Sequence, residues 1–438
     1  MKIRFINARI LTMREENNTL LPIIENGELH TDGSRIAYVG DKLPETENAS
    51  GKGECFDRTI DCRGNLLMPG FKNAHTHTAM TIFRSAADDL PLAEWLNNVI
   101  FPHEAMLTAE DIYTLNKLGI AEYMTSGITS ALDMYLTPES IAKSSADMDF
   151  RMVLTGGVNN FSQSVELLEK WYNELNGKND LISFQLGFHA EYTCSEELIG
   201  RVAQLAHDYH APVTAHVSET AGEVQGCIDR YGMTPVRFLA EKGIFDYGGT
   251  GYHLVHTTPD DRKVLKEKKI NVVSNPGSNT KLASGIAPIS DYLREGIRVG
   301  LGTDGPSSNN CLDMFREMFL VTGLAKLREQ DAAAVPAQEV LKMATVNGAK
   351  IMGIDADTLE AGKLADMIML DLGRPNMQPV QNIACNIVYS GSKENVCMTM
   401  VGGKILYDKF EGEAKFHFAE PVEDIYRDCA KIRDRILG

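Results

Sequence analysis

The chain has 438 residues, of which 43% are hydrophobic and 24% are charged. This length fits one α/β barrel of about 250 residues together with a smaller domain. The 43 basic and 60 acidic residues give a formal net charge of −17, whereas nucleic acids and anionic membranes are bound through basic patches. We therefore expect a protein that handles a small-molecule substrate and has no nucleic-acid or membrane partner.

The cysteines and the start of the chain bear on its compartment. The eight cysteines are dispersed and include no C-x-x-C pair. Residues 1–10 alternate polar and apolar side chains and lack the continuous apolar run of a signal segment. We expect reduced thiols and a cytoplasmic location. No run approaches the roughly 18 apolar residues of a membrane span, and the sequence leaves open whether the chain forms a homo-oligomer.

The first 64 residues are typical of short strands joined by turns. Strands are predicted at Ile3–Leu11, Ser34–Val39 and Thr59–Cys62, with Asn-Gly and Asp-Gly turn signals between them. No long amphipathic helix pattern occurs in this part.

From Asn65 to about Gly353, short apolar runs alternate with segments of helical length, such as Glu110–Thr125 and Ser195–His210. The predicted strands are Asn65–Pro69, Ile128–Met134, Arg151–Val158, Ser183–Phe188, Pro212–Val217, Tyr252–His256, Ile270–Ser274 and Ile297–Gly302. Alternating strands and helices form parallel sheets. Eight such units predict a closed (β/α)8 TIM barrel, and an open doubly wound sheet is the alternative.

After Gly353 the strand patterns return. They lie at Asp366–Asp371, Ile383–Tyr389, Asn395–Val401 and Lys404–Tyr407, and an amphipathic helix is predicted over Asp424–Leu437. Because strand-rich segments flank the barrel, we expect both chain ends to form one small discontinuous β-sandwich domain. The predicted division is 1–64 with 354–415 for this domain, 65–353 for the barrel and 416–438 for a C-terminal helical tail.

Barrel enzymes place their chemistry at the C-terminal ends of the strands. Here His75 and His77 follow the first predicted strand, His216 and His253 come at the fifth and sixth, and Asp304 follows the eighth. Residues i and i+2 of extended backbone point the same way, so His75 and His77 can share one ion. Three imidazoles and a carboxylate suit Zn²⁺ or Fe²⁺ with one position left for water. The alternative is that each histidine is an ordinary core or surface residue.

Glu219 follows His216 by three residues. Metal-activated water chemistry needs a proton carrier beside the ion, and Glu219 can fill that role. Its alternative role is to complement the dipole at the start of a helix over Thr220–Arg230.

At these residues the chain resembles the amidohydrolase superfamily, and the resemblance covers nearly its whole length. Within the superfamily it resembles the aminohydrolase branch, which contains cytosine, guanine and 5′-methylthioadenosine/S-adenosylhomocysteine deaminases and the triazine hydrolases. The motifs are Pro69-Gly70-Phe71 leading to His75-Thr76-His77, His216-x-x-Glu219, His253 and Leu301–Gly305. Those that point to the methylthioadenosine/S-adenosylhomocysteine deaminase group are Trp95-Leu96 with Pro102–Glu104, Gly127–Thr129 with Asp133–Tyr135, Asn275–Leu282, Ser307–Asn310 and Pro379–Asn382.

The resemblance implies one divalent metal, with zinc expected first and iron second. Its implied ligands are His75, His77, His216 and Asp304. The implied reaction is hydrolytic deamination, in which activated water attacks the ring carbon that bears the amino group. Asp304 would carry the water proton to the leaving amine, Glu219 would protonate the neighbouring ring nitrogen, and His253 would orient the attacking group. Predicted strand four ends Gly187-Phe188-His189 without the lysine that bridges two metals in some members, which favours one metal.

The same resemblance implies substrate contacts. Glu104 matches a carboxylate that bonds ribose hydroxyls, His189 a group near ribose and base, and Ser308 a residue of the pocket wall. The expected substrates are 5′-methylthioadenosine, 5′-deoxyadenosine and adenosine, with S-adenosylhomocysteine left open, and the products are the inosine analogue and ammonia. The alternative is another aminohydrolase of the branch: a guanine-type or other heterocycle deaminase, or a triazine hydrolase or chlorohydrolase.

The group members that accept S-adenosylhomocysteine hold its carboxylate with arginines just before and at the end of strand three. In this chain the matching strand ends in Gly156-Gly157, and Asp147 and Asp149 lie upstream. A carboxylate is best held by a bidentate arginine, so we expect a preference for a small uncharged 5′ group. The alternative is that Arg84 substitutes from another loop.

Two other classes of protein are disfavoured. Gly300–Gly305 matches G-x-G-x-x-G, but a loop pattern follows it where a dinucleotide fold needs a helix. A non-catalytic barrel would tolerate the loss of ligand residues, and every implied ligand position is filled.

Overall fold

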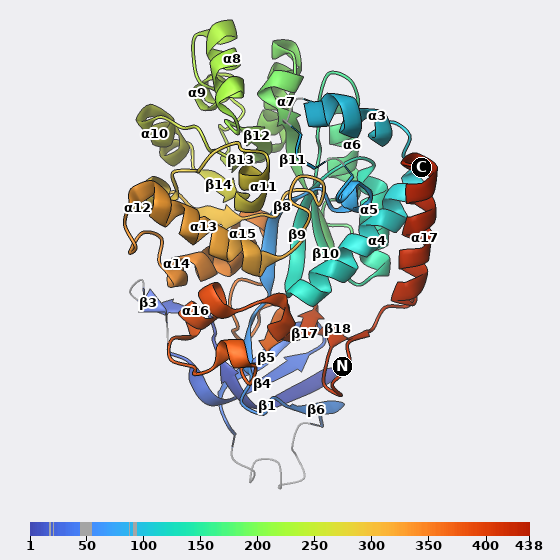
Figure 1. Cartoon of the computed structure of the whole chain (residues 1–438), viewed down its shortest axis with the longest axis vertical. Coiled ribbons are helices and arrows are strands. Elements are labelled where there is room, and N and C mark those ends of the chain that lie inside the picture. Colours follow the sequence, from blue (N-terminus) through green and yellow to red (C-terminus); the bar gives the residue numbers. More distant parts are fainter. Residues whose placement is uncertain (17–18, 21, 44–54, 87, 91–93) are drawn as a thin grey trace.

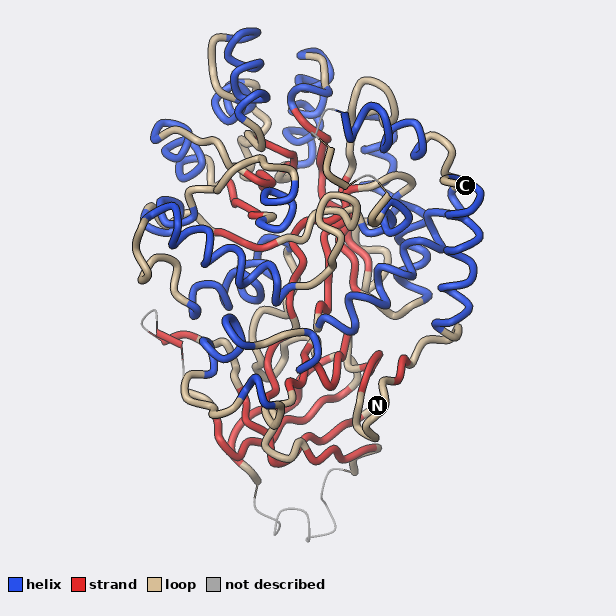
Figure 2. The backbone as a smooth tube through the Cα atoms, in the orientation of Figure 1, coloured by secondary structure: helices blue, strands red, loops and turns tan. Residues whose placement is uncertain are grey.

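The structure, a computed structural model, describes residues 1–16, 19–20, 22–43, 55–86, 88–90 and 94–438. Two sheets organise the chain, an eight-stranded parallel barrel and a mixed sheet built from both chain ends (Figure 1). Helices surround the barrel strands, whereas the mixed sheet lies below them in the same view (Figure 2). Among the described residues, no helix is both long and apolar enough to cross a lipid bilayer.

The barrel strands follow one another in chain order, each parallel to the next. They are β8 (Phe71–Thr76), β9 (Ile128–Met134), β10 (Arg151–Thr155), β11 (Ile182–Ala190), β12 (Val213–Val217), β13 (Gly249–His253), β14 (Ile270–Ser274) and β15 (Val299–Leu301). β15 returns to β8, where the Asp304 backbone N–H donates to the His75 carbonyl at 3.1 Å. The predicted (β/α)8 barrel is confirmed.

Helices connect most successive strands of the barrel. They are α4 (Ala109–Ser126), α5 (Pro138–Asp147), α6 (Val165–Leu175), α7 (Glu196–Tyr209), α8 (Ala221–Tyr231), α9 (Pro235–Glu241), α10 (Pro259–Glu267), α11 (Pro276–Lys281), α12 (Ile289–Arg294) and α13 (Met314–Glu329). Local sequence fixes several of their ends. Thr108, Thr220 and Thr258 each form a capping box with the acid three residues on, an arrangement that satisfies N–H groups left free at a helix start.

The mixed sheet joins strands from both ends of the chain, as predicted. Its order is β19-β18-β17-β16-β7-β1-β4-β5, and β6 also pairs with β1. The strands are β1 (Lys2–Ile10), β4 (Ile24–Asp32), β5 (Arg35–Asp41), β6 (Arg58–Asp61), β7 (Leu66–Pro69), β16 (Met367–Leu370), β17 (Val396–Val401), β18 (Lys404–Asp408) and β19 (Lys415–Phe416). Residues such as Phe5, Leu29 and Met400 give this part a hydrophobic core separate from that of the barrel.

Two predicted barrel and sheet strands differ in the structure. The run at 65–69 is a strand, but as β7 it pairs with β1 and β16 in the mixed sheet, and the first barrel strand is β8. The run at Ile383–Tyr389 is helical, and the Asn382 side chain accepts from the Cys385 N–H at its start. Short apolar runs neither identify their sheet partners nor exclude a buried helix.

A buried charged network joins the lower end of the barrel to the mixed sheet. The Arg151 guanidinium at the start of β10 pairs with Asp366 just before β16, with Nε 2.6 Å from Oδ2. Lys72 on β8 is fully buried beside them and donates to the Gly70 carbonyl and the Thr129 hydroxyl at 2.9 and 2.8 Å.

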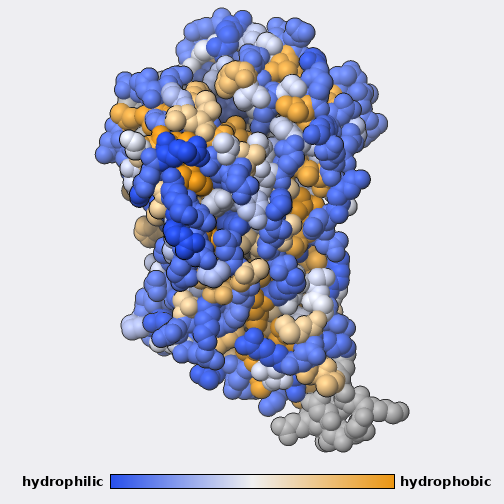
Figure 3. Space-filling model, turned by 90° about the vertical axis from the view of Figure 1, so that its right-hand side faces the viewer, coloured by the Kyte–Doolittle hydropathy of each residue, from blue (hydrophilic) through white to orange (hydrophobic). Residues whose placement is uncertain are grey.

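The C-terminal helix α17 (Val422–Ile436) packs against α4, and Arg435 pairs with Asp111 there. The face of the molecule shown in Figure 3 is mainly hydrophilic, with scattered apolar side chains. This surface is consistent with the 24% of charged residues in the chain.

Candidate active site

Histidines and an aspartate from separate strands meet at the C-terminal end of the barrel. His75 on β8, His216 on β12, His253 at the end of β13 and Asp304 after β15 are all buried, and their potential ligand atoms lie within 4.8 Å of one another. His77 lies beside them, with Nε2 3.1 Å from the Asp304 Oδ1. The structure thus brings together all five groups that the sequence analysis places at strand ends. The four-residue cluster holds His253 where the expected ligand set has His77.

Backbone strain marks two members of this group. His253 has φ of 68° and Asp304 has φ of 56°. Both lie in the left-handed region of backbone conformation, which residues other than glycine seldom adopt. Such conformations cost on the order of 1 kcal/mol or more and persist where the surroundings enforce them. Here the hydrogen bond from the Asp304 N–H to the His75 carbonyl fixes the turn that follows β15, the last strand of the barrel.

Carbonyl oxygens set the tautomers of three histidines. Nδ1 of His216 lies 2.8 Å from the His189 carbonyl, Nδ1 of His253 lies 2.8 Å from Asn279 Oδ1, and Nδ1 of His77 contacts the Met134 carbonyl. A carbonyl only accepts, so each Nδ1 carries the proton. The Nε2 lone pairs are therefore free to bind an ion, as at metal sites where an outer partner orients the imidazole.

His75 provides the test of whether a metal fits. Its ring stacks on Tyr252 with centroids 3.7 Å apart, and both ring nitrogens are buried without a hydrogen-bond partner among the residues that the structure describes. A buried polar atom without a partner is costly, and a bound cation would remove that cost. Burial lowers the pKa of His75 to about 3, so its ring is neutral and able to bind metal. Donor set and burial both fit one divalent ion.

Asp304 is held ionised and oriented. Burial opposes its ionisation, but the adjacent imidazoles of His75 and His77, whose Nε2 atoms lie 3.4 and 3.1 Å from Oδ1, hold its pKa well below the ordinary value. The hydroxyls of Ser278 and Ser308 donate to Oδ2 at 2.7 and 2.8 Å. These contacts leave Oδ1 facing the histidines.

Glu219 lies in the site rather than at a helix cap. Its Oε2 is 3.8 Å from His253 Nε2, and the Ser284 hydroxyl donates to Oε1 at 3.1 Å. The helix-start role belongs to Glu223, whose carboxylate accepts the backbone N–H groups of Ser218 and Glu219, each at 2.7 Å. The Glu219 carboxylate is therefore available to the cavity.

A cavity of about 550 Å³ opens over the cluster. Every expected site residue lines it except the deeper His75, so Glu104, His189 and Ser308 all face the same space as Glu219. Burial raises the pKa of Glu104 to about 7, and the nearby Tyr135 hydroxyl and His77 offset part of that effect.

The sequence analysis gives no role to several residues that shape this cavity or its ligands. Aromatic walls come from Trp95, Phe101, Tyr135, Phe161 and Tyr192. Ser278 and Asn279, which hold Asp304 and His253, belong to a family motif but were assigned no contact. Tyr135 directly follows β9, so the rule that strand ends carry function would have found it.

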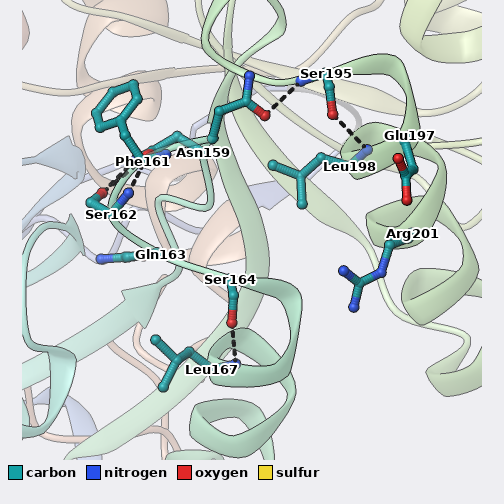
Figure 4. Close-up of a pocket in the computed structure, with 11 residues that line it drawn as sticks. Asn159, Phe161, Ser162, Gln163, Ser164, Leu167, Ser195, Glu197, Leu198 and Arg201 are labelled. Carbon is teal, nitrogen blue, oxygen red and sulfur yellow. Dashed lines mark hydrogen bonds between the residues drawn. The ribbon is translucent and has the colours of Figure 1, made fainter.

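The cavity wall after β10 is a loop, residues 156–164, that contains no lysine or arginine and is held by hydrogen bonds from its own backbone. The Asn159 Oδ1 accepts from the N–H groups of Phe161 and Ser162 at 3.0 and 2.8 Å, and the Gln163 amide oxygen accepts from the Gly157 N–H at 2.7 Å. On its outer side, the loop borders a shallow pocket of about 470 Å³ with Arg201 (Figure 4).

The charge of the cavity lining bears on which substrate tail the cavity can accept. Among the described residues, no lysine or arginine lines it. Arg201 pairs with Glu166, and Arg84 pairs with Glu122 away from the cavity. An anionic substrate tail would therefore meet no lysine or arginine among the described residues of this cavity.

Comparisons with known proteins match most or all of the chain. The model of the amidohydrolase family matches residues 66–406. A 5-methylthioadenosine/S-adenosylhomocysteine deaminase of Caldanaerobacter subterraneus is 38% identical over 100% of this chain and 99% of its own. A 5′-deoxyadenosine deaminase of Methanosarcina acetivorans is 39% identical, with 92% of each covered. The crystal structure of an adenosine deaminase from Xanthomonas campestris with bound zinc has a TM-score of 0.88 and 29% identity, with 99% of this chain and 98% of that chain covered.

Proposed function

The chain belongs to the amidohydrolase family, and on that premise we propose that it is a metal-dependent deaminase of adenosine-type nucleosides. The observation that carries the proposal is the buried His75, His216, His253 and Asp304 cluster with the Glu219 carboxylate beside it. Two relatives that are named as deaminases align with this chain over nearly their full length, and they support the reaction class.

We assign one divalent ion to His75, His77, His216 and Asp304, with zinc as the first candidate. The zinc in the related adenosine deaminase supports that identity. When bound, such an ion lowers the pKa of water and so supplies a nucleophile at neutral pH. All chemistry beyond that belongs to side chains of this protein.

Two carboxylates and one imidazole carry the protons. Asp304, braced through Oδ2 by two serine hydroxyls, accepts a proton from the attacking water and passes it to the departing amine. Glu219 shuttles the other proton of the attacking water to the ring nitrogen next to the attacked carbon, and His253 Nε2, 3.8 Å from Glu219, orients that water. Positioned acids and bases of this kind contribute about 10²- to 10⁴-fold each.

The nucleoside lies with its base at the cluster and its ribose toward Glu104. Glu104 accepts hydrogen bonds from ribose hydroxyls, while His189 and Ser308 contact the substrate from the other cavity walls. The shared cavity supports these roles. Its lack of described basic residues supports 5′-methylthioadenosine, 5′-deoxyadenosine or adenosine over S-adenosylhomocysteine as the preferred substrate.

Location and partners follow from the same picture. We propose that the enzyme acts in the cytoplasm on a free nucleoside, without nucleic-acid or membrane partners. The net charge of −17 and the eight free cysteines support this.

An ammonia-release screen of the metal-loaded protein tests the proposal. The panel is adenosine, 5′-deoxyadenosine, 5′-methylthioadenosine, S-adenosylhomocysteine, guanine, cytosine and an amino-triazine, with chloride release measured for a chloro-triazine. We expect the highest kcat/KM for an adenosine-type nucleoside. A higher value for guanine, cytosine or either triazine would overturn the assignment and favour another aminohydrolase of the branch.

A further inference from the structure

We infer that Glu317, on α13 and outside the cavity, is a positioning residue that holds Asp304 and His253 in their working geometry by joining two loops. The inference rests on the proposed function, because it gives those two residues their roles. The Glu317 side chain is fully buried.

One carboxylate links both loops. Its Oε2 accepts from the backbone N–H of Gly277 at 2.8 Å, and its Oε1 accepts from the Asn309 side-chain amide at 2.8 Å. Gly277 belongs to α11, which follows β14, whereas Asn309 belongs to the loop that follows β15. Glu317 thus bridges these two segments from α13, beside the direct link in which the Lys281 ammonium of α11 donates to the Ser307 carbonyl at 2.8 Å.

Each linked segment carries hydrogen-bond partners of the cluster. From α11, Ser278 donates to Asp304 Oδ2 and Asn279 accepts from His253 Nδ1. From the other loop, Ser308 donates to the same Asp304 oxygen. The partners are the two residues that follow Gly277 and the one residue that precedes Asn309, so a shift of either segment moves them directly.

Asn309 ties Glu317 still closer to Asp304. Its side-chain amide also donates to the Thr303 carbonyl at 2.7 Å, and Thr303 immediately precedes Asp304. The left-handed backbone of Asp304 therefore has a neighbour held in place by the same network.

The close approach of Glu317 depends on a glycine. A Cβ atom at position 277 would lie 2.5 Å from Glu317 Oε1 and 2.6 Å from Asn309 Oδ1, which is inside any real contact. Burial raises the pKa of Glu317 to about 8, although its hydrogen bonds from Gly277 and Asn309 oppose the rise. A carboxyl group is costly to bury, so its placement between the two loops calls for a specific role.

Glu317→Ala and Glu317→Gln test the inference, with Glu329→Gln at the end of the same helix as the matched control. The proteins are loaded with Co²⁺, whose visible absorption reports the ligand geometry, and release of the ion to a chelator is timed. For Glu317→Ala we expect an altered Co²⁺ spectrum, faster release, and kcat lowered between about 10- and 100-fold. KM should stay within about threefold, since α13 does not line the cavity. Glu317→Gln, which keeps one acceptor, should fall between Ala and wild type.

A folded Glu317→Ala protein with wild-type spectrum, release rate and kcat would overturn the inference and leave Glu317 a stability residue. Should that variant not fold, Glu317→Gln and Gly277→Ala carry the test, because the added Cβ displaces the carboxylate without removing it. The Co²⁺ spectrum and release rate need no substrate. If the nucleoside screen fails while they shift, the proposed function is wrong and the positioning role holds.

Discussion

The amide oxygen of Asn279 lies 2.8 Å from Nδ1 of His253. It requires a proton on Nδ1, so Nε2 presents its lone pair to the cluster, 3.8 Å from the Glu219 carboxylate. One hydrogen bond outside the cluster thus decides which nitrogen of His253 faces the other residues of the cluster.

Loss of His216 should remove the metal. His216→Ala deletes a buried imidazole already oriented by the His189 carbonyl. We expect metal content to fall from about one ion per chain to a small fraction, and activity to fall more than about 100-fold, since even loss of an outer partner costs 10- to 100-fold. Elemental analysis beside His207→Ala, on the exposed face of α7, decides the matter. Full occupancy in His216→Ala would mean that His216 is not a ligand.

A variant that cannot transfer a proton tests the role of Glu219. Glu219→Gln keeps the shape and the contact with Ser284 but carries no proton. We expect the metal to be retained while kcat drops at least about 100-fold. Glu241→Gln, an exposed carboxylate at the end of α9, serves as control. A metal-loaded Glu219→Gln enzyme with near-normal kcat would exclude Glu219 as the proton carrier.

The enzyme should discriminate between substrates by the charge of their 5′ group. A missing charge-assisted pair is worth roughly 1.5–3 kcal/mol, so kcat/KM for S-adenosylhomocysteine should lie about 10- to 100-fold below that for 5′-methylthioadenosine. Equal or reversed values would contradict this preference.

A gain of function tests the same point. At Gly157 an added Cβ meets its nearest atom, Met134 Cγ, at an ordinary 3.5 Å, so a side chain can begin there. Gly157→Arg should raise kcat/KM for S-adenosylhomocysteine relative to 5′-methylthioadenosine, whereas Gly157→Gln, of similar length and no charge, should not. An equal response of both variants would assign the effect to size.

The buried Lys72 should make the folding stability of the protein depend on pH in the alkaline range. Burial lowers its pKa from 10.5 to about 8, although Asp366 opposes the shift. Between about pH 8 and 10.5 the unfolded chain keeps a proton that the folded chain has lost, so the folded state gains stability as pH rises. The charge penalty, on the order of 3 kcal/mol, is fully present below pH 8.

Comparison with Lys72→Met isolates this term, because all other titrations are shared. In urea unfolding from pH 7 to 10, the stability of wild type relative to Lys72→Met should rise with pH. A difference that stays constant across this range would show that Lys72 does not titrate there.

The sequence predicts the barrel and the residues at its strand ends because both are local patterns. His75-Thr76-His77 is three residues long, and each strand–helix unit repeats one periodicity. What it misses depends on contacts between distant segments. β7 has the same apolar composition as a barrel strand, and only its pairing with β1 and β16 assigns it to the other sheet.

The supporting residues of the site are harder to find for the same reason. Ser278 and Asn279 lie on the short helix α11, whose composition gives no hint that one holds Asp304 and the other His253. Glu317 follows a helical pattern and would pass for a solvent-facing acid. A buried carboxylate becomes evident only when the helix is packed against both loops.

The hydrogen bond between the Asp304 N–H and the His75 carbonyl lies where the last barrel strand meets the first. The cluster of His75, His216, His253 and Asp304 therefore includes residues from both sides of the closing seam of the barrel. During synthesis the ribosome must release nearly the whole barrel before the seam can form, so an ion that needs both His75 and Asp304 would bind late. Such an ion would join the two sides of the seam, and we expect its chelation to loosen the contact between β8 and β15.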